Sequence, residues 1–354
     1  MDTRAPLPQR IEALLSLAAQ HSRRYAGVDA QLARARYRAE HPTQIMALKC
    51  MDGRIHLPHV TRTPMGIIQP FRNLGGIFDL GWPYLGELIT QGVAEARHAG
   101  QCVLLLVTYH YSQGSPDRGC AGFGGDVAAA RDFAQQLKAQ AMTLFSHDGA
   151  SVYPLVCGFE TDSDALLVHG DDGDILDMRT LAATQNHRID DALLQMFPYW
   201  PVTVRNDLAP LLRGNLAHVH ALRQAERRLD VDHREWAICI GRGFDFLHLP
   251  NTALIVGPYS PDLAAPVATA ARIIAANMVA GRIPDDGALL LASVPYERPG
   301  GDRARAEMKS RFLTRFAMQT LGQSAPELLN RLVVLTGVVH WPTRHLEVLA
   351  RHSP

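Results

Sequence analysis

The chain has 354 residues, 47% of them hydrophobic, which is enough for two domains with apolar cores. Its 35 lysine and arginine residues equal its 35 aspartate and glutamate residues, so no net field attracts nucleic acid or an anionic membrane, and we expect neither as a partner. No apolar run approaches the stretch of about 20 residues that crosses a membrane. The N-terminal segment MDTRAPLPQR has no apolar signal-peptide core. The five cysteines are few and odd in number, which favours a reducing, cytoplasmic location with thiols that can bind metal.

The first 43 residues are predicted to form an N-terminal helical arm. Apolar residues recur with helical spacing over residues 8–40, and Gly27 is expected to divide the helix. The pattern leaves open whether this arm lies on its own domain or packs on a neighbouring subunit. An apolar run at residues 45–48 then indicates a buried strand.

Polar residues follow that strand at alternate positions, Cys50, Asp52 and Arg54. In an extended chain, residues two apart share one face, so all three can point into one site. A second predicted strand, residues 102–109, ends in the same way with His110.

Cys120 follows His110 after a polar loop. The carboxyl ends of parallel strands meet at one edge of a sheet, where open α/β sheets bind their ligands. Two cysteines and one histidine that converge there form a three-ligand zinc site with an open fourth position, as zinc enzymes have. We therefore predict Cys50, His110 and Cys120 as the ligands of one Zn²⁺ per chain.

The next segments alternate between strand and helix patterns. We predict strands at residues 66–70, 153–159 and 165–169, and helices at 84–98 and at 127–144, the latter capped by Asp126. A turn is expected at residues 57–58, a hairpin turn at 171–174, and irregular backbone around Pro198, Pro201 and Pro210. This β-α-β-α-β order predicts a parallel core with helices on its faces.

The last third of the chain repeats the first. Residues 236–250 align with 44–58, residues 289–296 with 104–111, and residues 335–337 with 156–158. None of the metal ligands or the two charged residues is kept in this repeat. Cys50, Asp52, Arg54, His110 and Cys120 align with Arg242, Phe244, Phe246, Pro295 and Arg305. We therefore predict a domain at residues 44–230 that binds zinc and a degenerate second copy at residues 231–354.

The set of motifs resembles the β-class carbonic anhydrases. That family has Cys-x-Asp-x-Arg at one strand end, here Cys50, Asp52 and Arg54, then a histidine, and then a cysteine at the start of the next helix. Residues 71–76, FRNLGG, resemble the family's Arg-Asn-Ala-Gly motif. His110 and Cys120 are ten positions apart, and this longer spacing is similar to that of the divergent branch typified by the carboxysome shell carbonic anhydrase.

The resemblance implies an α/β fold with a β-carbonic-anhydrase-like parallel-core sheet and flanking helices, present twice, and reversible hydration of carbon dioxide to bicarbonate and a proton. Zinc would lower the pKa of its bound water toward about 7, and the resulting hydroxide would attack carbon dioxide. Asp52 is implied as the acceptor of the water's hydrogen bond and Arg54 as its partner. If that pair breaks, the carboxylate can close onto zinc. Substrate-pocket residues are expected at Phe71, Gly75, Gly76 and Tyr111.

The resemblance further implies a homodimer or a higher homo-oligomer, with the carboxysome as the alternative to a free cytoplasmic enzyme. Two other functions stay open. One is a zinc hydrolase of carbonyl sulfide or carbon disulfide on the same fold. The other is a non-catalytic, zinc-stabilised assembly protein, against which the presence of Asp52 and Arg54 argues, because a structural zinc site needs neither residue.

Overall fold

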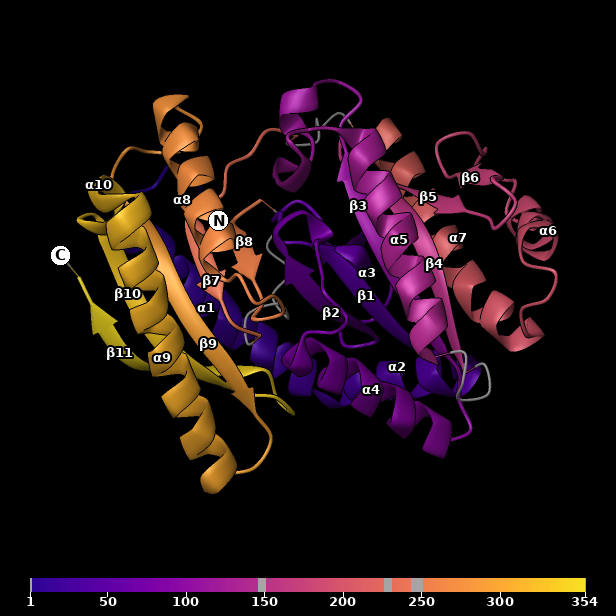
Figure 1. The fold of residues 1–354 in the computed structure, drawn as a ribbon, viewed down its shortest axis with the longest axis horizontal. Coiled ribbons are helices and arrows are strands. Elements are labelled where there is room, and N and C mark those ends of the chain that lie inside the picture. Colours follow the sequence, from indigo (N-terminus) through magenta and orange to yellow (C-terminus); the bar gives the residue numbers. More distant parts are fainter. Residues whose placement is uncertain (1, 146–150, 226–230, 243–250, 354) are drawn as a thin grey trace. The chain divides into compact units, whose positions relative to one another are not determined.

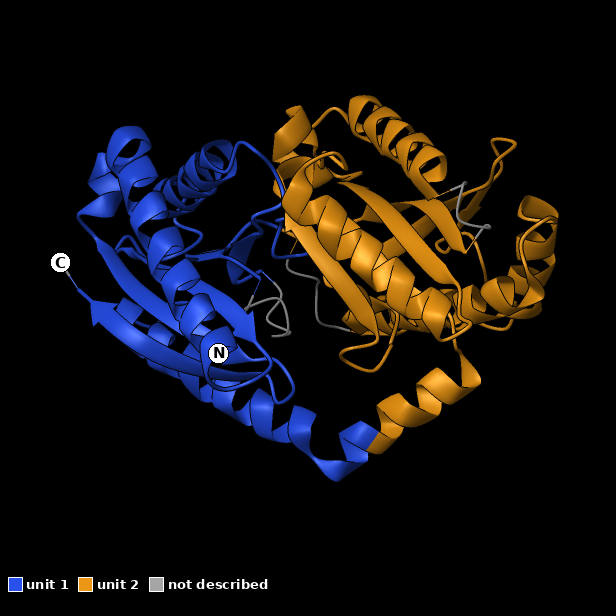
Figure 2. Cartoon of the chain, turned by 60° about the horizontal axis from the view of Figure 1, so that its bottom comes forward, with its two compact units in different colours: residues 1–31, 51–54, 232–354 blue, residues 32–50, 55–231 orange. Residues whose placement is uncertain are grey.

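The computed structural model describes residues 2–145, 151–225, 231–242 and 251–353. Three parts of the sequence predictions lie outside these described residues. They are the counterparts Phe244 and Phe246, the end of the aligned segment at residues 248–250, and the end of the predicted catalytic domain at residues 226–230. The chain divides into two compact units (Figure 2). Unit 1 comprises residues 1–31, 51–54 and 232–354, and unit 2 comprises residues 32–50 and 55–231.

Unit 2 contains a six-stranded sheet of order β2-β1-β3-β4-β5-β6. Its strands are β1 Gln44–Cys50, β2 Ile68–Asn73, β3 Val103–Tyr111, β4 Val152–Glu160, β5 Ala165–His169 and β6 Ile175–Asp177. The first four strands of this order pair in parallel, whereas β5 and β6 are antiparallel additions. Almost every residue of β1 and β3 is buried, because helices cover a parallel sheet on both faces.

Helices flank this sheet. The α-helices are α2 Val28–Glu40, α3 Leu57–Val60, α4 Pro83–His98, α5 Val127–Phe145, α6 His187–Met196 and α7 Val202–Gln224. Three short 3₁₀ helices are η1 Leu74–Gly76, η2 Pro116–Arg118 and η3 Ala121–Phe123. Helix α5 packs along β3 and β4 (Figure 1). The predicted cap is present, since the Asp126 carboxylate accepts a hydrogen bond from the backbone N–H of Ala129 at 3.0 Å.

Three local predictions in unit 2 need correction. The chain forms the short helix α3 where only a turn was expected at residues 57–58. Strand β2 begins at Ile68 and extends to Asn73, beyond the predicted 66–70. Pro210 lies inside α7, where irregular backbone was expected. Buried neighbours such as Leu208 and Leu212 hold that helix against the domain, so tertiary packing outweighs the poor helix propensity of proline.

Unit 1 contains a five-stranded sheet of order β11-β10-β9-β7-β8. Its strands are β7 Ala237–Ile240, β8 Ala253–Val256, β9 Ala288–Tyr296, β10 Leu332–His340 and β11 His345–His352. Its helices are α1 Leu7–Ala26, α8 Ala264–Val279, α9 Gly301–Ser324 and α10 Pro326–Leu329. The strand order is that of β5-β4-β3-β1-β2 in unit 2, so the predicted duplication of the α/β core is confirmed at the level of topology.

The strand pairing also tests the alignment of the two halves. Ile45 pairs with Leu104 in one sheet and Ala237 with Leu289 in the other, which agrees with the first two aligned blocks. The third block is displaced by one residue. Val103 faces Val152 in one sheet and Ala288 faces Leu332 in the other, so Gly158 corresponds to Val338 and the predicted equivalence with Gly337 was wrong.

Helix α1 packs on unit 1 of its own chain, which was one of the two arrangements left open for the N-terminal arm. The guanidinium of Arg10 is fully buried, pairs with Asp286 and lies 4.8 Å from the centre of the Trp236 ring. Ser22 donates a hydrogen bond to the carbonyl of Thr343 at 2.9 Å. Within the described part of the chain, every helix is too short or too polar to span a bilayer.

Candidate metal centre

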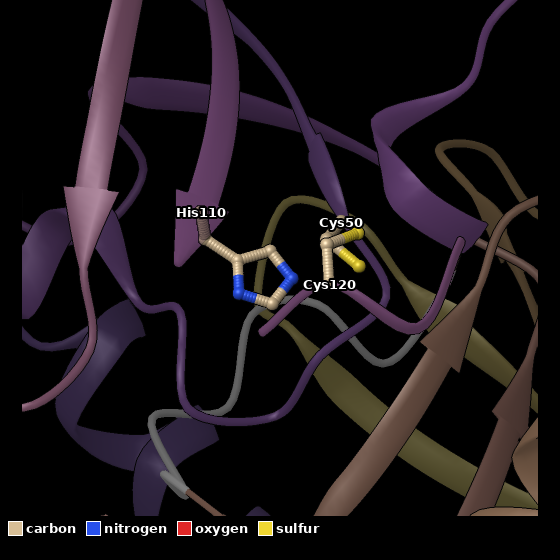
Figure 3. Close-up of side chains that lie close together, drawn as sticks. All are labelled: Cys50, His110 and Cys120. Atoms are coloured by element: carbon tan, nitrogen blue, oxygen red, sulfur yellow. The ribbon is translucent and has the colours of Figure 1, made fainter. Parts of the chain in front are cut away.

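The structure brings Cys50, His110 and Cys120 together in unit 2. One ligand atom from each lies within 4.8 Å of the others. All three residues are buried, with 4%, 2% and 2% of their surface exposed. Figure 3 shows the two sulfur atoms side by side, with the imidazole ring next to them.

The parallel pairing of β1 and β3 explains how two of these side chains meet. The paired strands run from Gln44 opposite Val103 to Leu48 opposite Val107. Cys50 is the last residue of β1, and His110 is the second-last residue of β3. Both strands therefore deliver their functional residue to the same carboxyl edge of the sheet, as expected from sequence.

Two acidic residues hold the loop that leads from His110 to Cys120. The Asp162 carboxylate accepts hydrogen bonds from the Ser112 hydroxyl at 2.8 Å and from the Gly114 N–H at 2.6 Å. Glu160, which is 2% exposed, accepts a bond from the Gln113 N–H at 3.2 Å. Neither residue was predicted from the sequence. Their signal was the cluster Glu-Thr-Asp directly after a buried strand.

Close glycine contacts bring the end of β2 to the turn that carries Cys120. Gly75 adopts φ 68°, which favours glycine, and a Cβ placed on Gly122 would lie only 2.6 Å from the Gly75 Cα. A Cβ on Gly76 would lie 3.0 Å from the carbonyl oxygen of Thr108 in β3. The glycines of the FRNLGG segment thus permit close backbone packing around the three candidate ligands.

The other two predicted pocket residues, Phe71 and Tyr111, make contacts elsewhere in unit 2. Phe71 is fully buried within β2. The hydroxyl of Tyr111 accepts a hydrogen bond from Arg179 at 3.3 Å, and its ring stacks on Tyr109. A cavity of about 220 Å³ in unit 2 is lined by other residues, among them Lys138 and Trp200. A substrate pocket at Phe71, Gly75, Gly76 and Tyr111 therefore stays a prediction.

Asp52 and Arg54 lie in unit 1 and form the expected ion pair. Arg54 donates from Nη2 to one carboxylate oxygen of Asp52 at 2.7 Å and from Nε to the other at 3.1 Å. The backbone N–H of Arg54 adds a third bond at 2.8 Å. Both side chains are about 95% buried, so the pair is shielded from water.

His233 and Glu235, which were not predicted from the sequence, lie next to this pair within unit 1. His233 Nε2 lies 3.0 Å from Arg54 Nη2, and Nδ1 lies 3.0 Å from Glu235 Oε2. Burial lowers the pKa of His233, but the carboxylates of Glu235 and Asp52 outweigh burial and raise that pKa above its usual 6.5. The only sequence signal was His-x-Glu directly before a strand.

The donor set of Cys50, His110 and Cys120 fits zinc. Thiolate sulfur and imidazole nitrogen are the ligands that Zn²⁺ prefers, and three protein ligands leave the fourth tetrahedral position to water or substrate. Two thiolates and one neutral imidazole also balance the charge of the ion.

Comparisons with known proteins bear on the same segment. Residues 41–192 match the family model described as Carboxysome Shell Carbonic Anhydrase, catalytic domain. The chain is 25% identical over 247 residues to a carboxysome shell carbonic anhydrase of Prochlorococcus marinus, covering 61% of this chain and 48% of the relative. It is 27% identical over 249 residues to that of Halothiobacillus neapolitanus, covering 58% and 48%.

The chain spans about half the length of the curated relatives that it matches. The matched residues 41–192 include all three candidate zinc ligands. The chain is therefore similar to the carboxysome shell carbonic anhydrases, and the similarity to their catalytic domain covers residues 41–192.

Proposed function

We propose that this protein is a zinc-dependent carbonic anhydrase that reversibly hydrates carbon dioxide to bicarbonate and a proton. The observation that carries the proposal is the convergence of two buried thiols and one imidazole, within 4.8 Å, in the segment that matches the catalytic domain. This combination of geometry and similarity supports both the proposed activity and the proposed metal.

Cys50, Cys120 and His110 would hold the zinc. When bound, zinc acts as a Lewis acid that lowers the pKa of water toward about 7 and so supplies a nucleophile at neutral pH. The two cysteines must lose their protons to bind, and the imidazole must be neutral, so metal binding will be stronger at higher pH. The buried surroundings of all three side chains keep bulk water from competing for their lone pairs.

Asp52 is proposed to accept the hydrogen bond of the attacking water and thereby to aim its lone pair at carbon dioxide. Asp52 follows Cys50 by two positions in the chain, so their Cα atoms can be at most about 7 Å apart. Arg54 holds the carboxylate in one orientation through two side-chain donors and one backbone donor. A fixed acceptor of this kind favours one orientation of the reacting water.

We further propose that residues 231–354 are the copy that has lost its zinc. Among the described positions, Arg242, Pro295 and Arg305 align with the three ligands, and none of them is a zinc ligand. The guanidinium of Arg242 lies 5.6 Å from the centre of the Trp341 ring, so this position now takes part in side-chain packing. The proposed domains are the arm 1–43, the catalytic domain 44–230 and this copy.

Stopped-flow hydration of carbon dioxide on metal-analysed protein tests the proposal. We expect activity with about one zinc per chain, loss of zinc in Cys50→Ala, and zinc without activity in Asp52→Ala. Cys102→Ala is the matched control, because this half-buried cysteine is outside the ligand set and should keep both zinc and activity. A zinc-loaded protein without hydration between about pH 7 and 9 would refute the proposal.

The same assays address the other proposals. Turnover of carbonyl sulfide or carbon disulfide without carbon dioxide hydration would instead support a hydrolase, and zinc without any turnover would support an assembly protein. The curated relatives, all named as carbonic anhydrases, do not favour either. We propose a cytoplasmic location, and the names of the relatives favour the carboxysome as the alternative compartment. We also propose a homodimer or a higher homo-oligomer, which sedimentation would test.

A further inference from the structure

Three buried side chains and the partly buried His233 form a continuous hydrogen-bonded network in unit 1. The network runs from the Asp52 carboxylate through Arg54 and His233 to Glu235, with contacts of 2.7, 3.0 and 3.0 Å. Two of its members come from the segment that follows Cys50, and the other two stand 179 and more positions later in the chain, just before β7. The second half of the chain therefore supports the ion pair of the first.

The chemistry of arginine fixes the direction of each bond in this network. A guanidinium carries only N–H donors and stays protonated at any ordinary pH. The 3.0 Å contact from Arg54 Nη2 therefore requires an unprotonated His233 Nε2 as its acceptor. The proton of the neutral imidazole is then on Nδ1, which donates it to Glu235.

Glu235 is itself held firmly. It is fully buried, and its Oε1 accepts the backbone N–H of Gly53 at 3.2 Å. A Cβ on Gly53 would lie 2.6 Å from the Ala253 carbonyl oxygen and 3.1 Å from the Glu235 Cγ, so only glycine fits between them. This close contact ties Glu235 to the peptide between Asp52 and Arg54.

The segment that carries His233 is fixed by a second side chain. The Asn251 amide donates to the Asp232 carbonyl at 2.6 Å, and its oxygen accepts the Arg234 N–H at 2.7 Å. The backbone on either side of His233 is thus bound to the chain next to β8. Little freedom is left for the imidazole to turn away from Arg54.

A bound metal ion is a different interpretation of the same cluster. Asp52, His233 and Glu235 offer ligand atoms within 4.8 Å of one another. However, the Arg54 guanidinium contacts two of these three groups and uses the lone pairs that a cation would need. A divalent ion there would also lie next to a permanent positive charge, which is strongly unfavourable in a buried site. The cluster is therefore a hydrogen-bond network.

We propose that His233 and Glu235 are positioning residues that hold Arg54 on Asp52, and through it the orientation of the Asp52 carboxylate. This inference rests on the proposed carbonic anhydrase function. It assigns to the zinc-less half of the chain a direct part in the activity. Removing a partner that orients a functional side chain typically lowers activity by about 10–100-fold.

Kinetics on three variants test the inference. In His233→Leu we expect kcat for carbon dioxide hydration to fall by about 10–100-fold with zinc content unchanged. His233→Gln should recover part of this loss, because its side-chain oxygen can still accept from Arg54. The kcat of Glu235→Gln should lie between the kcat of the wild type and that of His233→Leu. Exposed residues of unit 1 provide the matched controls His345→Leu and Glu327→Gln, which should behave as the wild type.

Imidazole ¹⁵N NMR gives a readout that needs no activity. At a pH high enough to deprotonate His233, whose pKa is raised, the neutral wild-type imidazole should show a protonated Nδ1 and an unprotonated Nε2, and Glu235→Gln should shift the Nδ1–H signal. A neutral imidazole that is protonated on Nε2, or His233→Leu with normal zinc content and wild-type kcat, would overturn the inference. If the wild type hydrates no carbon dioxide, the proposed function fails on its own, and the NMR result alone decides whether the network exists.

Discussion

The contact between Gly75 and Gly122 makes a quantitative prediction about the metal site. A Cβ in Gly122→Ala would lie 2.6 Å from the Gly75 Cα and 2.9 Å from its nitrogen. Carbon atoms in ordinary contact are about 3.5–4.0 Å apart, so the η1 and η3 backbones must separate by roughly 1 Å. Because Cys120 lies two residues before Gly122, its sulfur will move with the η3 backbone.

Zinc binding is sensitive to a displacement of this size. Zn–S distances are about 2.3 Å and tolerate only about 0.2 Å of variation. We therefore expect Gly122→Ala to weaken zinc binding by at least about tenfold and to lower the free energy of unfolding by about 1–3 kcal/mol, the usual cost of overpacking.

Competition with a chromophoric chelator measures the first quantity, and urea unfolding followed by circular dichroism measures the second. Gly301→Ala is the control, because a Cβ on Gly301 meets no atom within 4 Å and the position is the first residue of α9. A Gly122→Ala protein with the zinc affinity and the stability of the wild type would refute the steric argument.

Three further predictions concern charged groups. Asp162→Ala removes the acceptor of two loop hydrogen bonds, so zinc affinity should fall about tenfold in the chelator assay, whereas Asp191→Ala on the exposed surface should not change it. The pKa of His233 is raised in the folded protein, so its protonation stabilises the fold fully below about pH 6.5, and this stabilisation is lost as the pH rises through the folded pKa. The loss of stability in His233→Gln, measured by urea unfolding, should therefore be larger at about pH 6 than at about pH 9. Asp286→Ala leaves the buried Arg10 guanidinium without its carboxylate, and we expect a loss of about 1–3 kcal/mol in the free energy of unfolding, since Asp286 itself is one-third exposed.

Each of these predictions has an opposite outcome. Unchanged zinc affinity in Asp162→Ala would mean that the loop positions Cys120 without help from the Asp162 carboxylate. A His233→Gln effect that grows with pH would contradict the direction of the pKa shift. An Asp286→Ala protein as stable as the wild type would show that Arg10 finds another partner, and Asp285→Ala, which changes the exposed neighbouring pair with Arg331, is the control.

The sequence was sufficient to predict features for which a local residue pattern could be combined with a topological rule. Cys50 and His110 could be brought to one edge because apolar runs mark two strands and parallel strands share their carboxyl end. The duplication could be found because the repeated strands kept their apolar residues and their order. The one-residue error in the third block arose because the residues that align with 156–158 are apolar or small and have no distinctive side chain to fix the register.

The supporting residues could not be found in this way. Glu235 meets Gly53 across 182 positions of sequence, and Asp162 meets Ser112 across 50. Such hydrogen bonds depend on how distant segments pack and leave no periodic trace in the sequence. Pro210 could not be placed from the sequence for a related reason. Proline disfavours helices, but packing of the buried neighbours of Pro210 keeps this residue inside α7.

The division of the chain into units has a consequence for how the protein can be shortened. Residues 51–54 belong to unit 1, although the residues on both sides of them belong to unit 2. Asn251 and Ile255 donate backbone hydrogen bonds to the carbonyls of Gly53 and Met51, each at 2.9 Å. A fragment that ends at residue 230 would remove these donors and leave the segment that carries Asp52 without support. The second half of the chain therefore cannot be deleted without loss of the hydrogen bonds that hold residues 51–54.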